Sequence, residues 1–162
     1  MRFEEEMFLC LTITTIVIIV VIVWPLFRKY KAPLTILYYC GILYITLLSR
    51  VGNVWNGGNS LQVFRFIYWV KIYYKAYGIK GIPWALSDTY LNILLFVPMG
   101  ILLSEIKRFK YGWIVIIGFG CSLCIELMQV LLHLGMFATD DIVMNTIGVG
   151  IGTVIYRKRM RN

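Results

Sequence analysis

Charged residues are scarce in this sequence of 162 residues: they make up 15% of it, whereas 60% is hydrophobic. A mean hydropathy of +0.78 leaves too few polar residues to coat a globule in water, which argues against an ordinary soluble domain. Acidic residues are scarcest, with 8 Asp and Glu against 16 Lys and Arg, for a net charge of +8. Because the basic residues flank apolar runs, we interpret them as determinants of membrane topology and predict no nucleic-acid partner.

Cysteine is also too sparse for a disulfide framework or a structural zinc site. All four cysteines fall inside apolar stretches, which argues against a disulfide framework of the secreted kind. The Cys121-x-x-Cys124 spacing lacks the second pair that a structural zinc site needs. We therefore predict no metal site and no cofactor.

Long apolar runs dominate what remains, and they predict an all-α integral membrane bundle of about five transmembrane helices in a single domain, residues 1–162. A helix needs about 20 residues to cross the hydrocarbon at a rise of 1.5 Å per residue. Two spans are expected within residues 1–49 and three within residues 89–156. Their approximate bounds are 7–27, 33–49, 89–104, 111–134 and 141–156.

Residues 50–88 differ in composition and are expected to form an extracytoplasmic loop with an interfacial segment. Aromatic and basic residues interleave from Phe64 to Lys75. The aromatic residues alternate as in a strand, but an interfacial helix fits the composition equally well, so both alternatives stay open for residues 61–77. Tyr and Trp favour the headgroup level of a membrane in either case.

The positions of Lys and Arg predict the orientation of the chain. If the N-terminus is outside, ten of the sixteen basic residues fall on the cytoplasmic side, and each short cytoplasmic loop is positive. This orientation puts the C-terminus in the cytoplasm. It puts residues 50–88 and the loop at 135–140 outside.

Polar residues in the fourth predicted span share one helical stripe, spaced i, i+4, i+7 and i+11: Ser122, Glu126, Gln129 and His133. A carboxylate at mid-helix costs about 2.5–3.5 kcal/mol on insertion scales, so Glu126 must face the bundle interior, be protonated or find partners. The fifth span offers Asp141 and Asn145, four residues apart. We predict Glu126 and Asp141 as the functional pair, with ligand-binding roles for Asn92, Ser122, Gln129, His133 and Asn145.

Four further residues are predicted to serve helix packing: Pro98, Gly100, Gly148 and Gly152. Pro98 frees a backbone carbonyl in the third span for a neighbour or a ligand. Gly148 and Gly152 have the G-x-x-x-G spacing that lets another helix approach closely.

Three segments together resemble the VanZ-like family of bacterial membrane proteins, over roughly the C-terminal half: NILLFVPMGILL from Asn92, IELMQ from Ile125 and DDIVMNTIGVGIG from Asp140. The chain departs from the family pattern at Met136 and Ala138, where members often carry Arg and an acidic residue. The founding member is linked to teicoplanin resistance. The resemblance therefore implies a multi-pass protein of the bacterial cytoplasmic membrane with a role in glycopeptide resistance.

Three functions are compatible with these features. In the first, an outer-leaflet polar site engages a lipid-linked peptidoglycan precursor or a lipoglycopeptide antibiotic. In the second, a membrane enzyme modifies an envelope lipid or peptide, with Glu126 and Asp141 as acid and base or as ligands of a divalent cation. In the third, the protein is a non-catalytic assembly partner whose G-x-x-x-G face serves an oligomer or another membrane protein.

Overall fold

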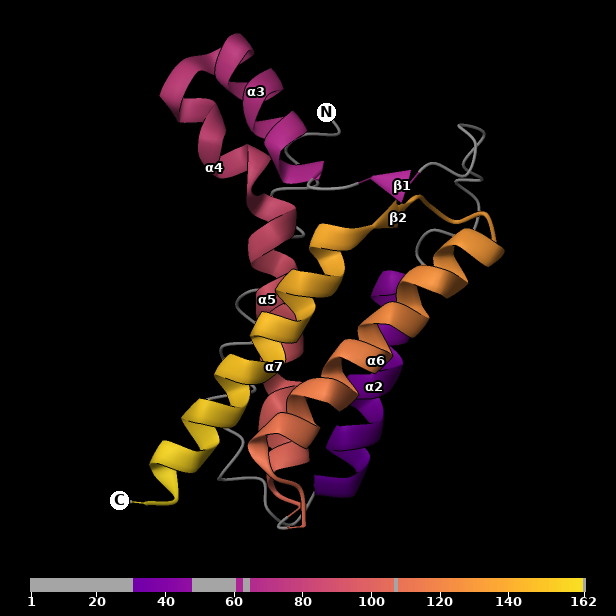
Figure 1. The fold of residues 1–162 in the computed structure, drawn as a ribbon, viewed down its shortest axis with the longest axis vertical. Coiled ribbons are helices and arrows are strands. Elements are labelled where there is room, and N and C mark those ends of the chain that lie inside the picture. The colour runs from indigo at the N-terminus through magenta and orange to yellow at the C-terminus, as the bar shows by residue number, and fades with distance from the viewer. Residues whose placement is uncertain (1–30, 48–60, 63–64, 107, 162) are drawn as a thin grey trace.

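The computed structural model of the chain describes residues 31–47, 61–62, 65–106 and 108–161 (Figure 1). Its fold is all-α, as predicted. The helices are α2 (Lys31–Thr46), α3 (Arg65–Tyr77), α4 (Ile82–Ala85), α5 (Ser87–Ser104), α6 (Tyr111–Leu131) and α7 (Thr139–Arg159), with a 3-10 turn η3 (Gly78–Gly81) before α4. The first predicted span, residues 7–27, lies outside the described residues.

Four long helices correspond to the second to fifth predicted spans. By length and composition, α6 is the described helix that is long and apolar enough to cross a membrane; Ala32–Thr46 and Thr89–Ser104 are apolar but shorter. Helix α6 ends at Leu131, three residues before the approximate end predicted for the fourth span, and the chain turns at His133, whose φ is +54°. The fifth helix begins two residues before the predicted bound, at Thr139.

The segment at residues 65–77 is the helix α3, so the strand alternative is wrong there. Strand pairing in the described chain is confined to β1 (Leu61–Gln62) and β2 (Phe137–Ala138), which run parallel. A strand needs a partner along its length, and this pair extends over two residues only. None of the α3 side chains is buried.

Helices α5 and α7 lie in contact at three glycines. A Cβ at Gly148 would overlap the carbonyl oxygen of Ile93, and a Cβ at Gly152 would overlap that of Val97. From the other side, a Cβ at Gly100 would overlap the carbonyl oxygen of a residue on α7. Small residues allow such backbone-to-backbone packing. The G-x-x-x-G face of α7 is therefore occupied by α5 of the same chain.

A side chain from α2 supports α5 beside Pro98, which lies inside that helix. The Tyr38 hydroxyl donates to the carbonyl of Leu95 at 2.7 Å and accepts the N–H of Met99 at 3.1 Å. Proline interrupts the hydrogen-bond ladder of a helix, and inserted side chains commonly satisfy the loosened backbone groups. Tyr38 thereby ties α2 to the part of α5 that proline interrupts.

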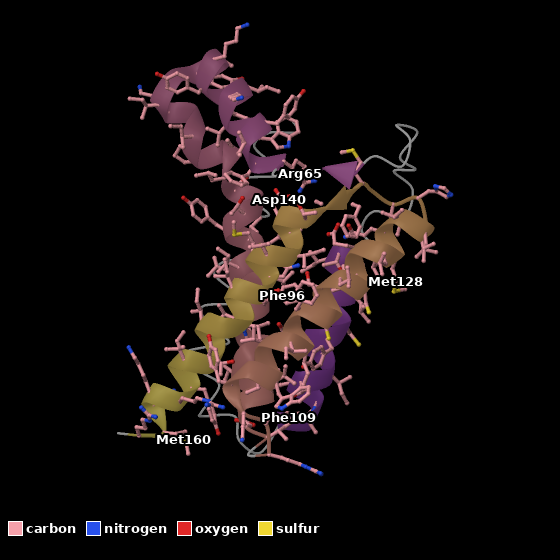
Figure 2. The ribbon with its side chains drawn as sticks, viewed as in Figure 1. Arg65, Phe96, Phe109, Met128, Asp140 and Met160 are labelled. Carbon is pink, nitrogen blue, oxygen red and sulfur yellow. The ribbon has the colours of Figure 1, made fainter. Side chains whose placement is uncertain are left out.

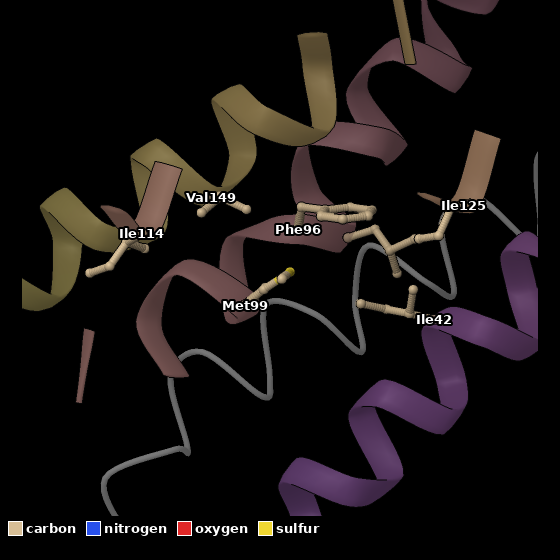
Figure 3. Close-up of a cluster of buried hydrophobic side chains, with 7 residues drawn as sticks. Ile42, Phe96, Met99, Ile114, Ile125 and Val149 are labelled. Atoms are coloured by element: carbon tan, nitrogen blue, oxygen red, sulfur yellow. The ribbon is translucent and has the colours of Figure 1, made fainter. Parts of the chain in front are cut away.

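The interior holds an apolar cluster contributed by all four long helices (Figure 3). Its members include Ile42, Phe96, Met99, Ile114, Ile125 and Val149. Beside this cluster, seven polar side chains are also buried: Ser122, Glu126, Gln129, Asp140, Asp141, Asn145 and Thr153.

The outer faces of the long helices are apolar. Large exposed side chains include Ile36, Leu37, Trp113, Ile116, Phe119, Val143, Ile147 and Ile151. Water-soluble proteins rarely expose so continuous an apolar surface, whereas polar groups inside and apolar groups outside are the arrangement that lipid favours.

The two ends of the bundle differ (Figures 1 and 2). One end carries α3, α4 and the β1–β2 pair, and we name it the α3 end. The opposite end, named the C-terminal end, carries the connection from α5 to α6 and the C-terminus. There the guanidinium of Arg157 donates to the carbonyl of Phe109 at 3.2 Å and lies over the Tyr111 ring.

Candidate functional site

A hydrogen bond between α6 and α7 sets the register of the site. The side-chain amide of Asn145 donates to the Ser122 hydroxyl at 2.8 Å, and both residues are buried. The two helices run in opposite directions (Figure 1), so the residue one turn toward the α3 end is Glu126 on α6 and Asp141 on α7. The predicted stripes of the two helices therefore meet, and their two carboxylates come to the same level.

Glu126 fixes the start of α7. Its side chain is 2% exposed, and Oε2 accepts the backbone N–H of Ala138 at 2.8 Å. Ala138 belongs to β2 and is the residue directly before α7. A buried backbone N–H that loses its acceptor costs about 1–3 kcal/mol, so this contact stabilises the turn between α6 and α7.

Two acidic residues in the first turn of α7 hold the start of α3 (Figure 2). Asp140 accepts the backbone N–H of Phe66 through Oδ2 at 3.2 Å. Asp141 pairs with the Arg65 guanidinium at 3.3 Å, and their side chains are only 12% and 18% exposed. Carboxylates suit both positions, because the first turn of a helix favours negative charge and leaves backbone N–H groups to be satisfied.

Two buried acceptor atoms at this level have no hydrogen-bond partner among the described residues: Oδ1 of Asp140 and Oδ1 of Asn145. Both side chains are anchored by their other polar atom, so neither can simply turn toward water. Most buried polar atoms in proteins are satisfied, and an unsatisfied one costs about 1–3 kcal/mol. Both atoms are buried, so a donor group from outside the chain could bond them only where the surrounding side chains move apart.

We name this set of residues the polar layer: Arg65, Ser122, Glu126, Asp140, Asp141 and Asn145. The prediction from sequence missed two of them. Asp140 stands directly before the chosen Asp141, and the Asp-Asp pair at the start of a helix was the available signal. Arg65 lies 76 residues from its partner, and nothing in the sequence connects the two.

Three predicted ligand-binding residues do not belong to the polar layer. Gln129 is buried, but its amide donates to the carbonyl of Thr46 at 2.9 Å and so satisfies the end of α2. His133 is exposed beyond the end of α6, and Asn92 is half-buried on α5. In the described part of the chain, no hydrogen bond joins His133 or Asn92 to the polar layer.

Each candidate catalytic residue already has a partner within the chain. Glu126 and Asp141 each hold a hydrogen bond or ion pair, and Ser122 faces an amide instead of a base. No group of three or more His, Cys, Asp or Glu side chains among the described residues is placed to hold a metal ion.

The family of the chain is shown by a match to a known family. A family model described as VanZ/LLP1 matches residues 11–160. The chain belongs to the VanZ/LLP1 family. The match extends far beyond the C-terminal half of the chain, which holds the three segments that resemble the VanZ-like family. No curated protein and no solved structure matches the chain.

Membership of the VanZ/LLP1 family, which is membrane-associated, agrees with the apolar outer faces of the helices and with the span-like composition of α6. The polar layer makes a backbone contact at Ala138, which is one of the two positions, with Met136, where the chain departs from the VanZ-like pattern. Glu126 accepts a hydrogen bond from the backbone N–H of Ala138, and this bond does not depend on the side chain at position 138. The guanidinium that meets Asp141 comes from Arg65 on α3.

Proposed function

We propose that this VanZ/LLP1 protein spans the bacterial cytoplasmic membrane several times and that its polar layer, at the outer face, binds the headgroup of an amphiphile. The apolar outer faces of α2, α6 and α7 support the membrane setting, because in water they would be exposed to solvent.

The distribution of charge supports this orientation. Lys110, Arg157, Lys158 and Arg159 lie at the C-terminal end of the bundle. Basic residues flanking membrane helices favour the cytoplasmic side, so the C-terminus lies in the cytoplasm and the α3 end lies outside. The N-terminus is then outside for a chain of five spans. The polar layer is at the level where molecules of the outer leaflet and the cell wall meet the protein.

The unsatisfied acceptors Asp140 Oδ1 and Asn145 Oδ1 are the observation that carries the binding function. They call for a headgroup that offers N–H or O–H donors, and the neighbouring carboxylates favour a donor with positive charge. Two kinds of amphiphile combine such donors with an apolar tail: a lipid-linked peptidoglycan precursor and a lipoglycopeptide antibiotic of the teicoplanin type. Either ligand would give the protein a role in glycopeptide resistance.

The test is susceptibility to teicoplanin and vancomycin in a Gram-positive host that lacks the gene. Wild-type protein should protect, whereas Glu126→Gln and Asp141→Asn should not, because both remove negative charge from the polar layer. Glu105→Gln is the matched control, since Glu105 directly follows α5 at the C-terminal end. All forms are compared at equal amounts in the membrane. Full protection by both polar-layer variants would contradict the proposal.

A second candidate, a membrane enzyme that modifies an envelope lipid or peptide, is favoured by one observation: the Glu126 and Asp141 carboxylates lie at the same level of adjacent helices. Their existing contacts oppose it, because an acid–base pair must release its partners to move protons. Incubating purified protein with a lipid-linked peptidoglycan precursor separates the two functions. Conversion of the precursor, lost in Glu126→Gln, would favour the enzyme over the binding protein.

A further inference from the structure

The segment from α3 to α4 is strongly basic and lacks negative charge of its own. No acidic residue occurs in the sequence between Glu6 and Asp88. Arg65 forms an ion pair with Asp141, whereas Lys71, Lys75 and Lys80 form no ion pair with any described residue. A positive surface without counter-charges attracts an anionic partner.

Two of these lysines share one face of α3. Lys71 and Lys75 are four residues apart, so their side chains lie one above the other on the helix surface, and both are exposed. Exposed Tyr68 and Tyr74 flank them on either side. Basic residues beside exposed aromatic rings are typical of helices that lie in the headgroup region of a membrane.

Aromatic rings form a second stripe on α3. The ring centroids of Trp69 and Tyr73 are 6.1 Å apart, and those of Tyr73 and Tyr77 are also 6.1 Å apart. The backbone of this stripe packs against η3, where a Cβ at Gly81 would overlap the carbonyl oxygen of Tyr73. The turn at η3 therefore braces α3 and leaves the Lys71–Lys75 face uncovered by the described chain.

The attachment of α3 places it at the boundary of the apolar surface. Its first residues are held by Asp140 and Asp141 in the first turn of α7. The exposed apolar side chains of α7 begin directly after these two, at Val143. In the membrane setting proposed above, α3 therefore begins where the hydrocarbon ends.

We propose that the Lys71–Lys75 face of α3 binds the phosphate groups of anionic phospholipids in the leaflet that surrounds the α3 end. The lysines supply two ammonium groups one helical turn apart, and the flanking tyrosines supply rings that favour the headgroup level. The inference rests on the proposed membrane setting but not on the ligand of the polar layer.

The experiment uses the full chain reconstituted in lipid vesicles and measures quenching of Trp69 fluorescence by lipids with brominated acyl chains. The difference between wild type and Trp69→Phe isolates the signal of Trp69 from that of the other four tryptophans. Brominated phosphatidylglycerol, which is anionic, is compared with brominated phosphatidylcholine, which is zwitterionic, at equal mole fraction.

We expect phosphatidylglycerol to be preferred beside Trp69, with a relative binding constant higher by about fivefold for each lysine, since a juxtamembrane Lys contributes about 1 kcal/mol. The Lys71→Gln/Lys75→Gln double variant should lose this preference, whereas Lys110→Gln, at the C-terminal end, should keep it. Equal quenching by the two lipids in wild type, or a preference that survives in the double variant, would overturn the proposal.

Trp113 distinguishes failure of this proposal from failure of the membrane setting. It is 60% exposed on the outer face of α6 and should be quenched by both lipids. Quenching of Trp113 without quenching of Trp69 would show that the bundle is inserted and α3 lies away from lipid, which overturns the proposal alone. Absence of quenching at both tryptophans would overturn the membrane setting as well.

Discussion

The side-chain amide of Asn145 on α7 donates to the hydroxyl of Ser122 on α6 at 2.8 Å, while the other polar atom of Asn145 stays buried without a partner in the described chain. The same side chain is thus a structural contact through its nitrogen and a candidate ligand contact through its oxygen. These two roles respond to different substitutions.

Ser122→Ala and Asn145→Ala should both destabilise the protein, because each removes the same interhelical hydrogen bond. A loss of about 0.6–2 kcal/mol is expected for such a bond between membrane helices. Thermal unfolding in detergent, at equal protein and detergent concentration, measures it. A large loss in one variant with none in the other would contradict the shared bond.

Tyr38→Phe should destabilise the bundle by about 1–3 kcal/mol, since it removes the two hydrogen bonds that the hydroxyl makes to the Leu95 carbonyl and the Met99 N–H beside Pro98. Tyr44→Phe is the control, because Tyr44 lies on the same helix and is 60% exposed. Thermal unfolding of the two variants should separate them clearly. Equal stabilities would show that the Tyr38 hydroxyl does not support α5.

Gly152→Ala should weaken the packing of α7 on α5 by about 1–3 kcal/mol, because the new methyl group overlaps the Val97 carbonyl and the two backbones must separate. Gly120→Ala adds the same methyl on α6, where nothing lies within 4 Å, and should be neutral or stabilising by up to about 1 kcal/mol. Disulfide crosslinking between cysteines placed on α5 and α7 reports the helix separation. Unchanged crosslinking in Gly152→Ala would contradict the close contact.

Arg65 and Asp141 should be energetically coupled. Arg65→Ala and Asp141→Ala each break a largely buried pair, so the double variant should lose less stability than the sum of the two single losses. A coupling of about 0.5–3 kcal/mol is expected from contacting residues. Hydrogen exchange of the first α3 amides, including Phe66, should also speed up in both single variants. Additive losses with unchanged exchange would mean that the pair does not hold α3.

Much of the helical framework could be predicted because hydropathy acts locally. Apolar runs of sufficient length predicted the four long helices of the described chain. Spacing alone placed Glu126 and Ser122 on one face of α6, and Asp141 and Asn145 on one face of α7. The helix termini were less predictable. α6 ends at Leu131, the chain turns at His133, and β2 then pairs with β1 across 76 positions of the sequence.

The contacts that complete the site depend on tertiary structure. The aromatic residues within 65–77 alternate along the sequence as in a strand, but the segment forms a helix. The first turn of α7 holds the start of that helix, through the N–H of Phe66 and the guanidinium of Arg65. Gln129 lies on the same helical stripe as Glu126, which suggested a ligand-binding role. Its side-chain amide instead donates to a backbone carbonyl at the end of α2. His133 continues the stripe in sequence only, because the helix has already ended.

Binding by the polar layer is tested most directly by measuring teicoplanin binding to the purified full chain in lipid nanodiscs, comparing wild type, Ser122→Ala and Asn145→Ala. We expect wild type and Ser122→Ala to bind with similar affinity, because the Asn145 oxygen is retained, and Asn145→Ala to bind at least tenfold more weakly, a loss of about 1.4 kcal/mol. Binding by Asn145→Ala that equals wild type, or no binding by wild type, would contradict the proposed teicoplanin-binding role of the polar layer.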